Sequence, residues 1–259
     1  KGSVYIWSFM KILYHIGRYL TLLGSFFKSP EKFSVYWNLI LVECNSIGVG
    51  SVLIVVLISV FIGAVMTVQT AYQLESPLLP DSLIGTTVAN SSMLELAPTV
   101  TSLVLAGKVG SAIASQLGTM RVTEQIDALE TLSFDPVAYL ATPRLIAALI
   151  MIPALTMIAN ATAITSAWLT LVLATDVRTS DVMDGLRLSF IPFQVVYSLI
   201  KAVCFGGAIA FVCSYEGYVT EAGAEGVGRS TALAVVLASV SILVLDALVA
   251  AVFAPFIQA

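Results

Sequence analysis

Residues 45–74 form a long stretch that carries no Asp, Glu, Lys, Arg or His. A helix needs only about 20 apolar residues to cross the hydrocarbon core of a bilayer, so this stretch is more than long enough. Further apolar stretches follow, and 58% of the 259 residues are hydrophobic while only 11% are charged. Typical soluble domains are about 25% charged. The composition excludes a soluble enzyme, a disordered chain and a disulfide scaffold, and it predicts an all-α polytopic membrane protein.

The hydropathy pattern predicts five membrane-spanning helices in one domain that covers residues 1–259. Their expected bounds are about residues 47–73, 83–118, 143–174, 191–214 and 230–257. The second stretch exceeds a minimal crossing, so we expect it to project from the bilayer or to be irregular. Asp135-Pro136 and Thr142-Pro143 both resemble helix starts before the third span, and Pro153 is expected to kink that span. Residues 216–229 are predicted to form a Gly-rich acidic loop.

The first 46 residues differ from the transmembrane core that we expect at residues 47–259. One polar stripe recurs at helical spacing in residues 4–27 and consists of Ser8, Lys11, His15, Arg18 and Ser25. A basic stripe opposite an aromatic-rich apolar side favours an N-terminal amphipathic helix in the membrane interface, and the alternative is a tilted first span. Ser29-Pro30-Glu31 then resembles the start of a second, elbow-like helix.

The distribution of basic residues predicts the orientation in the membrane. Five of the twelve Lys and Arg residues precede position 33, namely Lys1, Lys11, Arg18, Lys28 and Lys32. The turn at residues 74–82 has no basic residue, and neither does the C-terminal tail. Because cytoplasmic loops are enriched in Lys and Arg, we expect a cytoplasmic N-terminus and an external C-terminus. The connections at residues 119–142 and 215–229 then face the cytoplasm.

Four charged residues fall at apparent membrane depth: Glu95, Lys108, Lys201 and Asp246. Such residues are costly in hydrocarbon and usually face a cavity or a partner. Several polar residues precede Glu95 in the sequence, namely Thr87, Asn90, Ser91 and Ser92. One interpretation is the polar wall of a substrate cavity. The other is an internal ion pair, for instance with Lys108 or Lys201.

Small residues recur every fourth position through the second span, at Ser102, Ala106, Gly110, Ala114 and Gly118. This spacing lets neighbouring helices approach closely, so we interpret it as packing.

The sequence shows no catalytic constellation, no metal site and no cofactor motif. Gly107-Lys108 lacks the upstream glycine of a phosphate-binding loop, and the single histidine cannot build a metal site. The odd number of cysteines, three, fits no disulfide framework. The net charge of −4 argues against nucleic acid as a partner. If the protein uses ATP to move a substrate, the ATPase must be another chain.

The segment at residues 121–132 is a charged amphipathic stretch between two spans. Ile126, Leu129 and Leu132 make its apolar edge. Glu124, Asp127 and Glu130 make its acidic edge. The segment is either a solvated connector or a docking helix for a cytoplasmic partner.

Several motifs together resemble the MlaE/YrbE permease family over nearly the whole chain. They are Met93-Leu-Glu-Leu-Ala-Pro98, Ala106-Gly-Lys-Val-Gly-Ser111, Thr123-Glu-Gln-Ile-Asp-Ala-Leu129, Asp135-Pro136, Pro143-Arg144, Glu216-Gly-Tyr218 and Gly226-Val-Gly-Arg-Ser-Thr231. The Glu-Gln-Ile-Asp-Ala-Leu segment with its downstream Asp-Pro is the most specific of these.

The resemblance implies a homodimeric permease subunit of an ABC system in the inner membrane of Gram-negative bacteria. Such systems move phospholipids between the inner and outer membranes and pair two permeases with two cytoplasmic ATPases and a periplasmic ring of MCE-domain proteins.

The resemblance also implies roles for particular residues. Residues 121–132 would be the ATPase-coupling helix, with Arg121, Glu124, Gln125, Ile126, Asp127 and Leu129 as its contacts. Glu216, Gly226 and Arg229 would form a second cytoplasmic contact. Glu95 matches the acid that lines the lipid cavity, and the other wall candidates are Gln69, Tyr72, Asn90 and Ser91.

Two other classes of function compete with this interpretation. An ion-coupled secondary transporter would use Glu95 and Lys108 as a relay, but such proteins usually carry inverted repeats and we see none in the sequence. A non-transporting scaffold for an extracytoplasmic partner would leave Glu95 and the docking helix unexplained.

Overall fold

The computed structural model describes residues 33–74, 82–174, 191–221 and 223–257, with the single positions Gly17, Gly24, Gly185 and Arg187. Within these residues every regular element is a helix, so the all-α prediction is confirmed. The predicted interfacial helix at residues 4–27 and the helix start at Ser29 lie outside the residues described as continuous structure.

Five helical segments are long and apolar enough to cross a membrane, as predicted. They are Tyr36–Gln73, Ser82–Val122, Pro136–Leu173, Pro192–Tyr218 and Ala224–Phe253. The elements that build them are α2 (Phe33–Ile47), η1 (Val49–Ser51), α3 (Val52–Gln73), α4 (Ser82–Ser91), η2 (Ser92–Leu96), α5 (Ala97–Leu105), η3 (Ala106–Gly110), α6 (Ser111–Val122), α8 (Pro136–Ala174), α10 (Pro192–Tyr218) and α11 (Ala224–Ile257). The short helix α7 (Gln125–Thr131) joins α6 to α8.

Two predicted boundaries are wrong because a helix continues farther than its sequence pattern suggests. The first span does not begin at residue 47, since α2 and α3 are separated only by the 3₁₀ turn η1 and form one membrane-length segment. The third span begins at Pro136, where the Asp135 carboxylate accepts hydrogen bonds from the backbone N–H groups of Val137 and Ala138 at 3.0 and 3.3 Å. Pro143 therefore lies inside α8 and starts no helix.

The predicted Gly-rich loop at residues 216–229 is also wrong. Helix α10 continues to Tyr218 and α11 starts at Ala224, so only residues 219–223 connect the two helices. The glycines at 226 and 228 fall inside α11. Their lack of a side chain does not stop the helix, because the long apolar stretch that follows stabilises it by packing and membrane burial.

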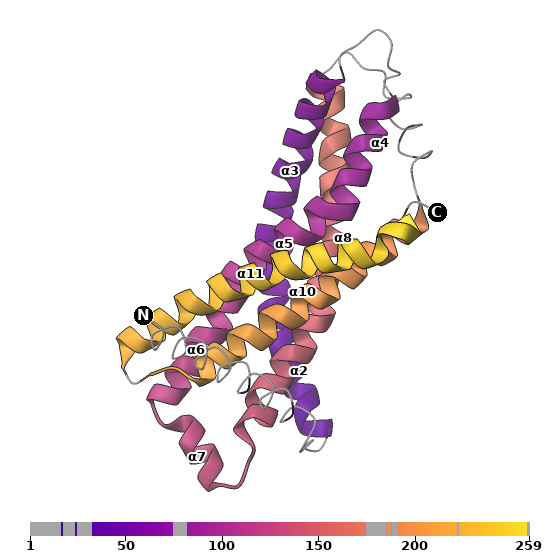
Figure 1. The fold of residues 1–259 in the computed structure, drawn as a ribbon. Coiled ribbons are helices and arrows are strands. Elements are labelled where there is room, and N and C mark those ends of the chain that lie inside the picture. Colours follow the sequence, from indigo (N-terminus) through magenta and orange to yellow (C-terminus); the bar gives the residue numbers. More distant parts are fainter. Residues whose placement is uncertain are drawn as a thin grey trace, which may run out of the picture.

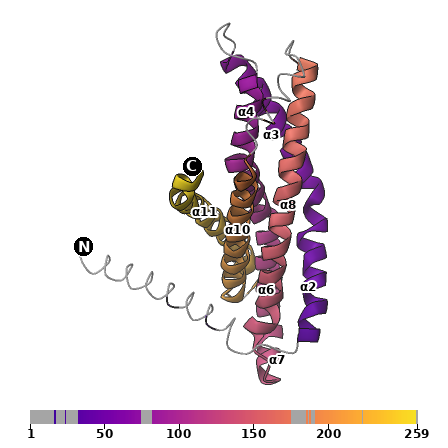
Figure 2. The same cartoon turned by 90° about the vertical axis from the view of Figure 1, so that its right-hand side faces the viewer.

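The helices form an elongated bundle (Figure 1). Helices α3, α4 and α8 run together at one end (Figures 1 and 2). Farther down, α10 and α11 run obliquely to these helices and pack on α5 and α6 (Figure 1). Helix α7 lies at the opposite end, beside the place where α10 ends and α11 begins (Figure 1). The two connections that were predicted to share one side of the membrane therefore share one end of the bundle.

The small-residue stripe of the second span is a packing seam, as predicted. Ser102, Ala106, Gly110, Ala114 and Gly118 are all buried. A Cβ added at Gly110 would meet the sulfur of Cys213, and one added at Gly118 would meet the hydroxyl of Thr220. The seam thus lets α6 and η3 lie close against α10.

Helices α3 and α8 approach each other closely through a second set of small residues. A Cβ at Gly63 would overlap the carbonyl oxygen of Ala163. One turn away, the Ser166 hydroxyl donates a hydrogen bond of 2.6 Å to the carbonyl of Val60. Together the two seams hold the long spans in fixed register.

Candidate functional site

A buried lysine joins three spans through two ion pairs. The Lys201 side chain in α10 is fully buried, and its Nζ lies 2.7 Å from Glu95 Oε2 in η2 and 2.6 Å from Asp246 Oδ1 in α11. A buried charge needs a partner because its desolvation is costly. These three residues form the charged cluster of the candidate site; the sequence suggested Lys201 as one possible partner of Glu95 and gave Asp246 no role.

The backbone of the second span supplies a further acceptor to this cluster. Pro98 has no N–H, so it cannot bond to the carbonyl of Leu94 one turn earlier. Lys201 Nζ donates a hydrogen bond of 3.1 Å to that carbonyl. The preceding residue, Ala97, donates its N–H to Ser92, which gives the π-helical turn that carries Glu95. Such turns are frequent at functional sites.

Two uncharged side chains complete the surroundings of the cluster. The Tyr197 ring lies beneath the lysine, with its centroid 5.0 Å from Nζ. The Thr99 hydroxyl donates a hydrogen bond of 3.2 Å to Asp246 Oδ1. An aromatic face attracts a cation, so both groups stabilise the charged forms of their neighbours.

The ion-pair interpretation of Glu95 is confirmed, and its partner is Lys201. Lys108 points elsewhere: its Nζ contacts the carbonyl of Gly50 at the break between α2 and α3. The Glu95 side chain nevertheless remains 51% exposed, against 20% for Asp246. Glu95 therefore belongs to the buried cluster and also presents a carboxylate edge outside it.

The other predicted wall residues are spread over two helices. Asn90 in α4 accepts a hydrogen bond of 3.0 Å from Gln194 in α10, and Ser91 is half-buried. Gln69 and Tyr72 lie exposed on α3, with Tyr72 75% exposed. The polar contacts of Glu95 run to α10 and not to α3, so a cavity that includes all five residues stays a prediction.

Helix α7 presents a different surface from the one predicted. Ile126 is completely buried, so it anchors the helix beneath the bundle and offers no contact to a partner. Leu129 is half-buried. The exposed apolar side chains are Leu132 at 68% and Phe134 at 42%. Phe134 was missed because it follows the amphipathic segment and precedes Asp135-Pro136.

Polar contacts hold α7 against the ends of α6 and α10. Arg121 Nη1 lies 2.6 Å from Asp127 Oδ1, and the Arg121 guanidinium lies 5.7 Å from the centroid of the Tyr218 ring. The Tyr218 hydroxyl donates a hydrogen bond of 3.1 Å to Glu130. We call this set of four residues the α7 clamp. Arg121 and Asp127 were predicted to contact the ATPase; their contacts within the chain, and the role of Tyr218, were not predicted.

The remaining predicted cytoplasmic residues differ in exposure. Glu124 and Gln125 are exposed, and Glu124 adopts a left-handed backbone conformation with φ of 59°. Glu216 is buried within α10, because that helix continues past it. Gly226 is half-buried in α11 and Arg229 is exposed. Of the second predicted contact, Arg229 alone is exposed.

Comparison with known proteins agrees with these features. The sequence matches the family Permease MlaE over residues 40–252. A probable ABC transporter permease protein of Rickettsia prowazekii is 37% identical over 231 residues, which are 89% of this chain and 87% of the relative.

A plant and a cyanobacterium also have similar proteins. The chloroplastic protein TRIGALACTOSYLDIACYLGLYCEROL 1 of Arabidopsis thaliana is 35% identical over 222 residues, 86% of this chain and 63% of the relative. A probable ABC transporter permease protein of Synechocystis is 36% identical over 202 residues, 78% of this chain and 76% of the relative. With the family match across most of its length and five membrane-length helices, the chain belongs to the MlaE permease family.

Proposed function

We propose that the chain is the membrane subunit of an ABC transporter that moves phospholipids between the inner and outer membranes. Two copies would work with two cytoplasmic ATPases and a periplasmic ring of MCE-domain proteins. The subunit would lie in the inner membrane with a cytoplasmic N-terminus and a periplasmic C-terminus. Family membership and the names of the Rickettsia and Synechocystis relatives support the permease role.

The observation that carries the proposal is a half-exposed carboxylate inside a membrane span. Insertion scales put the cost of an acidic residue at a helix centre at about 2.5–3.5 kcal/mol for Asp. Glu95 keeps 51% of its side chain exposed although Lys201 pairs with it. A carboxylate edge that stays accessible at this depth is suited to a lipid headgroup and its ordered water, and poorly suited to bare hydrocarbon.

The geometry also suggests how ATP hydrolysis would reach this site. A cytoplasmic ATPase would contact the exposed Leu132 and Phe134 beside α7. The α7 clamp connects that helix to Tyr218 at the end of α10. The same helix carries Lys201, 17 residues earlier and so roughly 25 Å away along its axis. Displacement of α7 would thereby move the lysine that holds Glu95.

Reconstitution in liposomes tests the proposal. The purified chain, its ATPase and its MCE protein should transfer fluorescent phospholipid to acceptor vesicles only when ATP is present. Glu95→Gln should lower the transfer rate at least tenfold, while ATPase co-purification and dimer assembly stay at wild-type levels. A wild-type complex that hydrolyses ATP without moving phospholipid would overturn the proposal. Transport driven by an ion gradient without the ATPase would instead favour a secondary transporter.

A further inference from the structure

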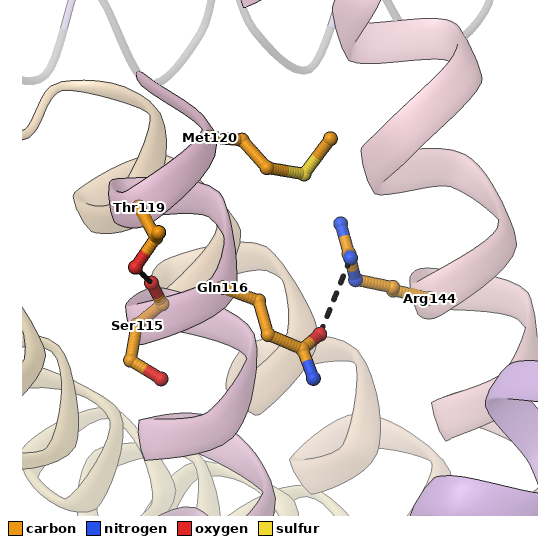
Figure 3. Close-up of a pocket in the computed structure, with 5 residues that line it drawn as sticks. All are labelled: Ser115, Gln116, Thr119, Met120 and Arg144. Carbon is orange, nitrogen blue, oxygen red and sulfur yellow. Dashed lines mark hydrogen bonds between the residues drawn. The ribbon is translucent and has the colours of Figure 1, made fainter. Parts of the chain in front are cut away.

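A hollow of about 440 Å³ opens between α6 and α8, at the end of the bundle near α7. Its lining residues are Ser115, Gln116, Thr119, Met120 and Arg144 (Figure 3). Ligand-binding pockets usually measure about 300–1,000 Å³ and combine apolar surface with a few placed polar groups. The hollow has this size and this mixture, although it is a shallow depression that is wide open on one side, and it lies apart from the charged cluster. Gln116 follows Glu95 by 21 residues of the same span, roughly 30 Å along a helix.

Arg144 is the charged group of this hollow and keeps donor capacity. Its side chain is only 8% exposed. Nη1 donates to the carbonyl of Leu140 at 3.1 Å, and Nη2 donates to Gln116 Oε1 at 3.3 Å, as the dashed line in Figure 3 shows. Nε lies 3.1 Å from Glu43 Oε1, but its N–H has no aligned hydrogen-bond acceptor among the described residues. Nε is buried, but each Nη carries two N–H groups, so one N–H on each is left beyond these two hydrogen bonds.

The charges around the hollow indicate the class of ligand. A planar guanidinium suits the paired oxygens of a phosphate or carboxylate group. Glu43 already balances the charge of Arg144, so a doubly charged free phosphate would be repelled by the carboxylate. A singly charged phosphodiester meets less repulsion, and the side-chain amide of Gln116 lines the same space as a further donor. The hydroxyls of Ser115 and Thr119 also line it, but they donate to backbone carbonyls of their own helix.

The depth of the hollow favours a lipid as the source of that phosphodiester. Helix α8 has 39 residues. At 1.5 Å per residue it is about 58 Å long, more than the roughly 40–45 Å of a bilayer with its headgroups. The helix therefore extends beyond the hydrocarbon, and with α7 outside the bilayer we expect its first turns to do so; Arg144 comes eight residues after Pro136. Thr119 and Met120 are likewise near the end of α6 at Val122. These residues fit the headgroup layer, with the Met120 thioether on the apolar side.

We propose that this hollow binds the phosphodiester headgroup of a phospholipid from the leaflet on the α7 side, held by Arg144 and Gln116. The inference rests on the proposed function and adds a second lipid site to it. The site lies on the flank of the subunit, between α6 and α8, where a lipid can arrive laterally from the bilayer. It is one binding site along the path of the transported lipid, at the end of the bundle where the ATPase would act.

The test uses the full chain in alkyl maltoside micelles with ¹³C-methyl methionine. The Met120 methyl signal, identified with Met120→Leu, is followed during titration with dihexanoyl-phosphatidylglycerol. Met157, 41% exposed on α8, serves as the internal control. We expect a saturable shift of Met120 and none of Met157. Thr119→Trp should fill the hollow and weaken binding at least tenfold, whereas Thr123→Trp, one turn farther on, should not. Arg144→Gln and Gln116→Leu should weaken binding in the same way.

Two other ligands show whether the phosphodiester, the acyl chains or a free phosphate ion causes the Met120 shift. An equal Met120 shift with dihexanoylglycerol, which lacks the phosphate, would overturn the proposal because binding would then be apolar only. A shift with inorganic phosphate alone would also overturn it, since the site would then hold a free ion. Wild-type binding that survives Thr119→Trp would place the lipid elsewhere and contradict the proposal.

Transport by the ATPase-loaded complex is measured separately. Thr119→Trp should slow phospholipid transfer at least threefold, and Thr123→Trp should leave the rate unchanged. If the wild-type complex transfers no phospholipid, the proposed function fails, while the Met120 titration still decides whether the hollow binds a phosphodiester. If transfer is normal in Thr119→Trp although binding is lost, the site is not on the transport path and the inference is wrong.

Discussion

Lys201 carries its charge on a side chain that is completely buried, and its neighbours account for this. Removing one partner from a buried ion pair leaves an uncompensated charge and costs about 3–5 kcal/mol, although the pair itself adds little over well-packed apolar groups. The cluster therefore fixes how α10, α11 and the second span meet, more than it adds to stability. At the scale of single residues, the unusual positions among the described residues include this lysine and the left-handed Glu124 and Ser133.

Replacing the lysine should destabilise the protein, and a matched second change should restore part of the loss. We expect Lys201→Met to lower the free energy of unfolding by about 3–5 kcal/mol, because Asp246 is left with little exposure and no cation. Lys201→Met combined with Asp246→Leu should regain at least half of this loss. Thermal unfolding in micelles measures both, and Lys108→Met is the control because Lys108 is exposed. A single variant as stable as wild type would contradict this account of the cluster.

Replacing Glu124 by glycine should stabilise helix α7. A non-glycine residue in the left-handed region is strained by about 1–3 kcal/mol, and glycine removes that strain at an entropic cost of about 0.5–1 kcal/mol. Glu124→Gly should therefore stabilise α7 by about 1 kcal/mol. Gln125→Gly, at the first helical position of α7, should destabilise it by a similar amount. Hydrogen exchange of the α7 amides reports both changes, and equal effects of the two substitutions would argue against strain at residue 124.

At the scale of the elements, small residues decide how closely the long helices approach. Helix propensity alone favours alanine over glycine by about 1 kcal/mol inside a helix. At Gly63 the gain is outweighed, because the added methyl would overlap the backbone of Ala163, which cannot rotate away. At Gly107 nothing lies within 4 Å of an added Cβ. The same substitution should thus have opposite signs at the two positions.

We expect Gly63→Ala to lower the unfolding temperature in micelles and Gly107→Ala to leave it unchanged or raise it. The size of the loss at Gly63 should be about 1–3 kcal/mol, the usual cost of overpacking in a close-packed core. If Gly63→Ala were as stable as Gly107→Ala, the close contact of α3 and α8 in the structure would be wrong.

Two substitutions should loosen the α7 clamp to different extents. Tyr218→Phe removes the hydrogen bond to Glu130 and keeps the ring under Arg121. Arg121→Gln removes both the ion pair with Asp127 and the cation–π contact. An exposed ion pair contributes up to about 1 kcal/mol, as does an exposed cation–π contact, so Arg121→Gln should raise α7 amide exchange more than Tyr218→Phe does. The test is which variant gives the faster exchange of the α7 amides. Faster exchange in Tyr218→Phe than in Arg121→Gln would contradict the clamp.

Sequence periodicity predicted the five spans, the helix between the second and third spans, and the packing stripe at Ser102–Gly118. It missed the two π-helical turns, because a π turn depends on which carbonyl each N–H reaches and not on the type of residue. It also could not choose between Lys108 and Lys201 as partner of Glu95. That choice depends on the register of α10 against the second span, which packing between distant segments decides. The burial of Ile126 was missed because it, too, depends on packing between segments that are distant in the sequence.

At the scale of the whole molecule, apolar side chains cover the outside as well as the core. Helix α11 exposes one apolar row toward its surroundings. It consists of Leu233, Val236, Val240, Leu243, Val244, Leu248 and Val252. Water would penalise such a surface, whereas lipid or a second copy of the chain would not. Such a surface suits a bilayer, in which the candidate site and the α7 clamp would lie at different depths.

Single cysteines can test the orientation of this body. In a background that lacks Cys44, Cys204 and Cys213, cysteines at Thr123 and Glu221 should react with impermeant maleimide only from the cytoplasmic side. A cysteine at Ser82 should react only from the opposite side. Intact cells and inverted vesicles provide the comparison. Labelling of Thr123 and Glu221 from different sides would contradict the five-span fold, whereas labelling of both from outside would reverse only the predicted orientation.

An ammonium group has three N–H bonds. Lys201 has three oxygen acceptors within reach: Glu95 at 2.7 Å, Asp246 at 2.6 Å and the Leu94 carbonyl at 3.1 Å. Its donors are thus already occupied, so an anionic headgroup that reaches the lysine must displace one of these oxygens. Of the two acids, Glu95 has the more exposed side chain, so it is the one that can turn outward. The site would then bind its ligand by exchange, with the protein's own carboxylate as the competitor that returns when the lipid leaves.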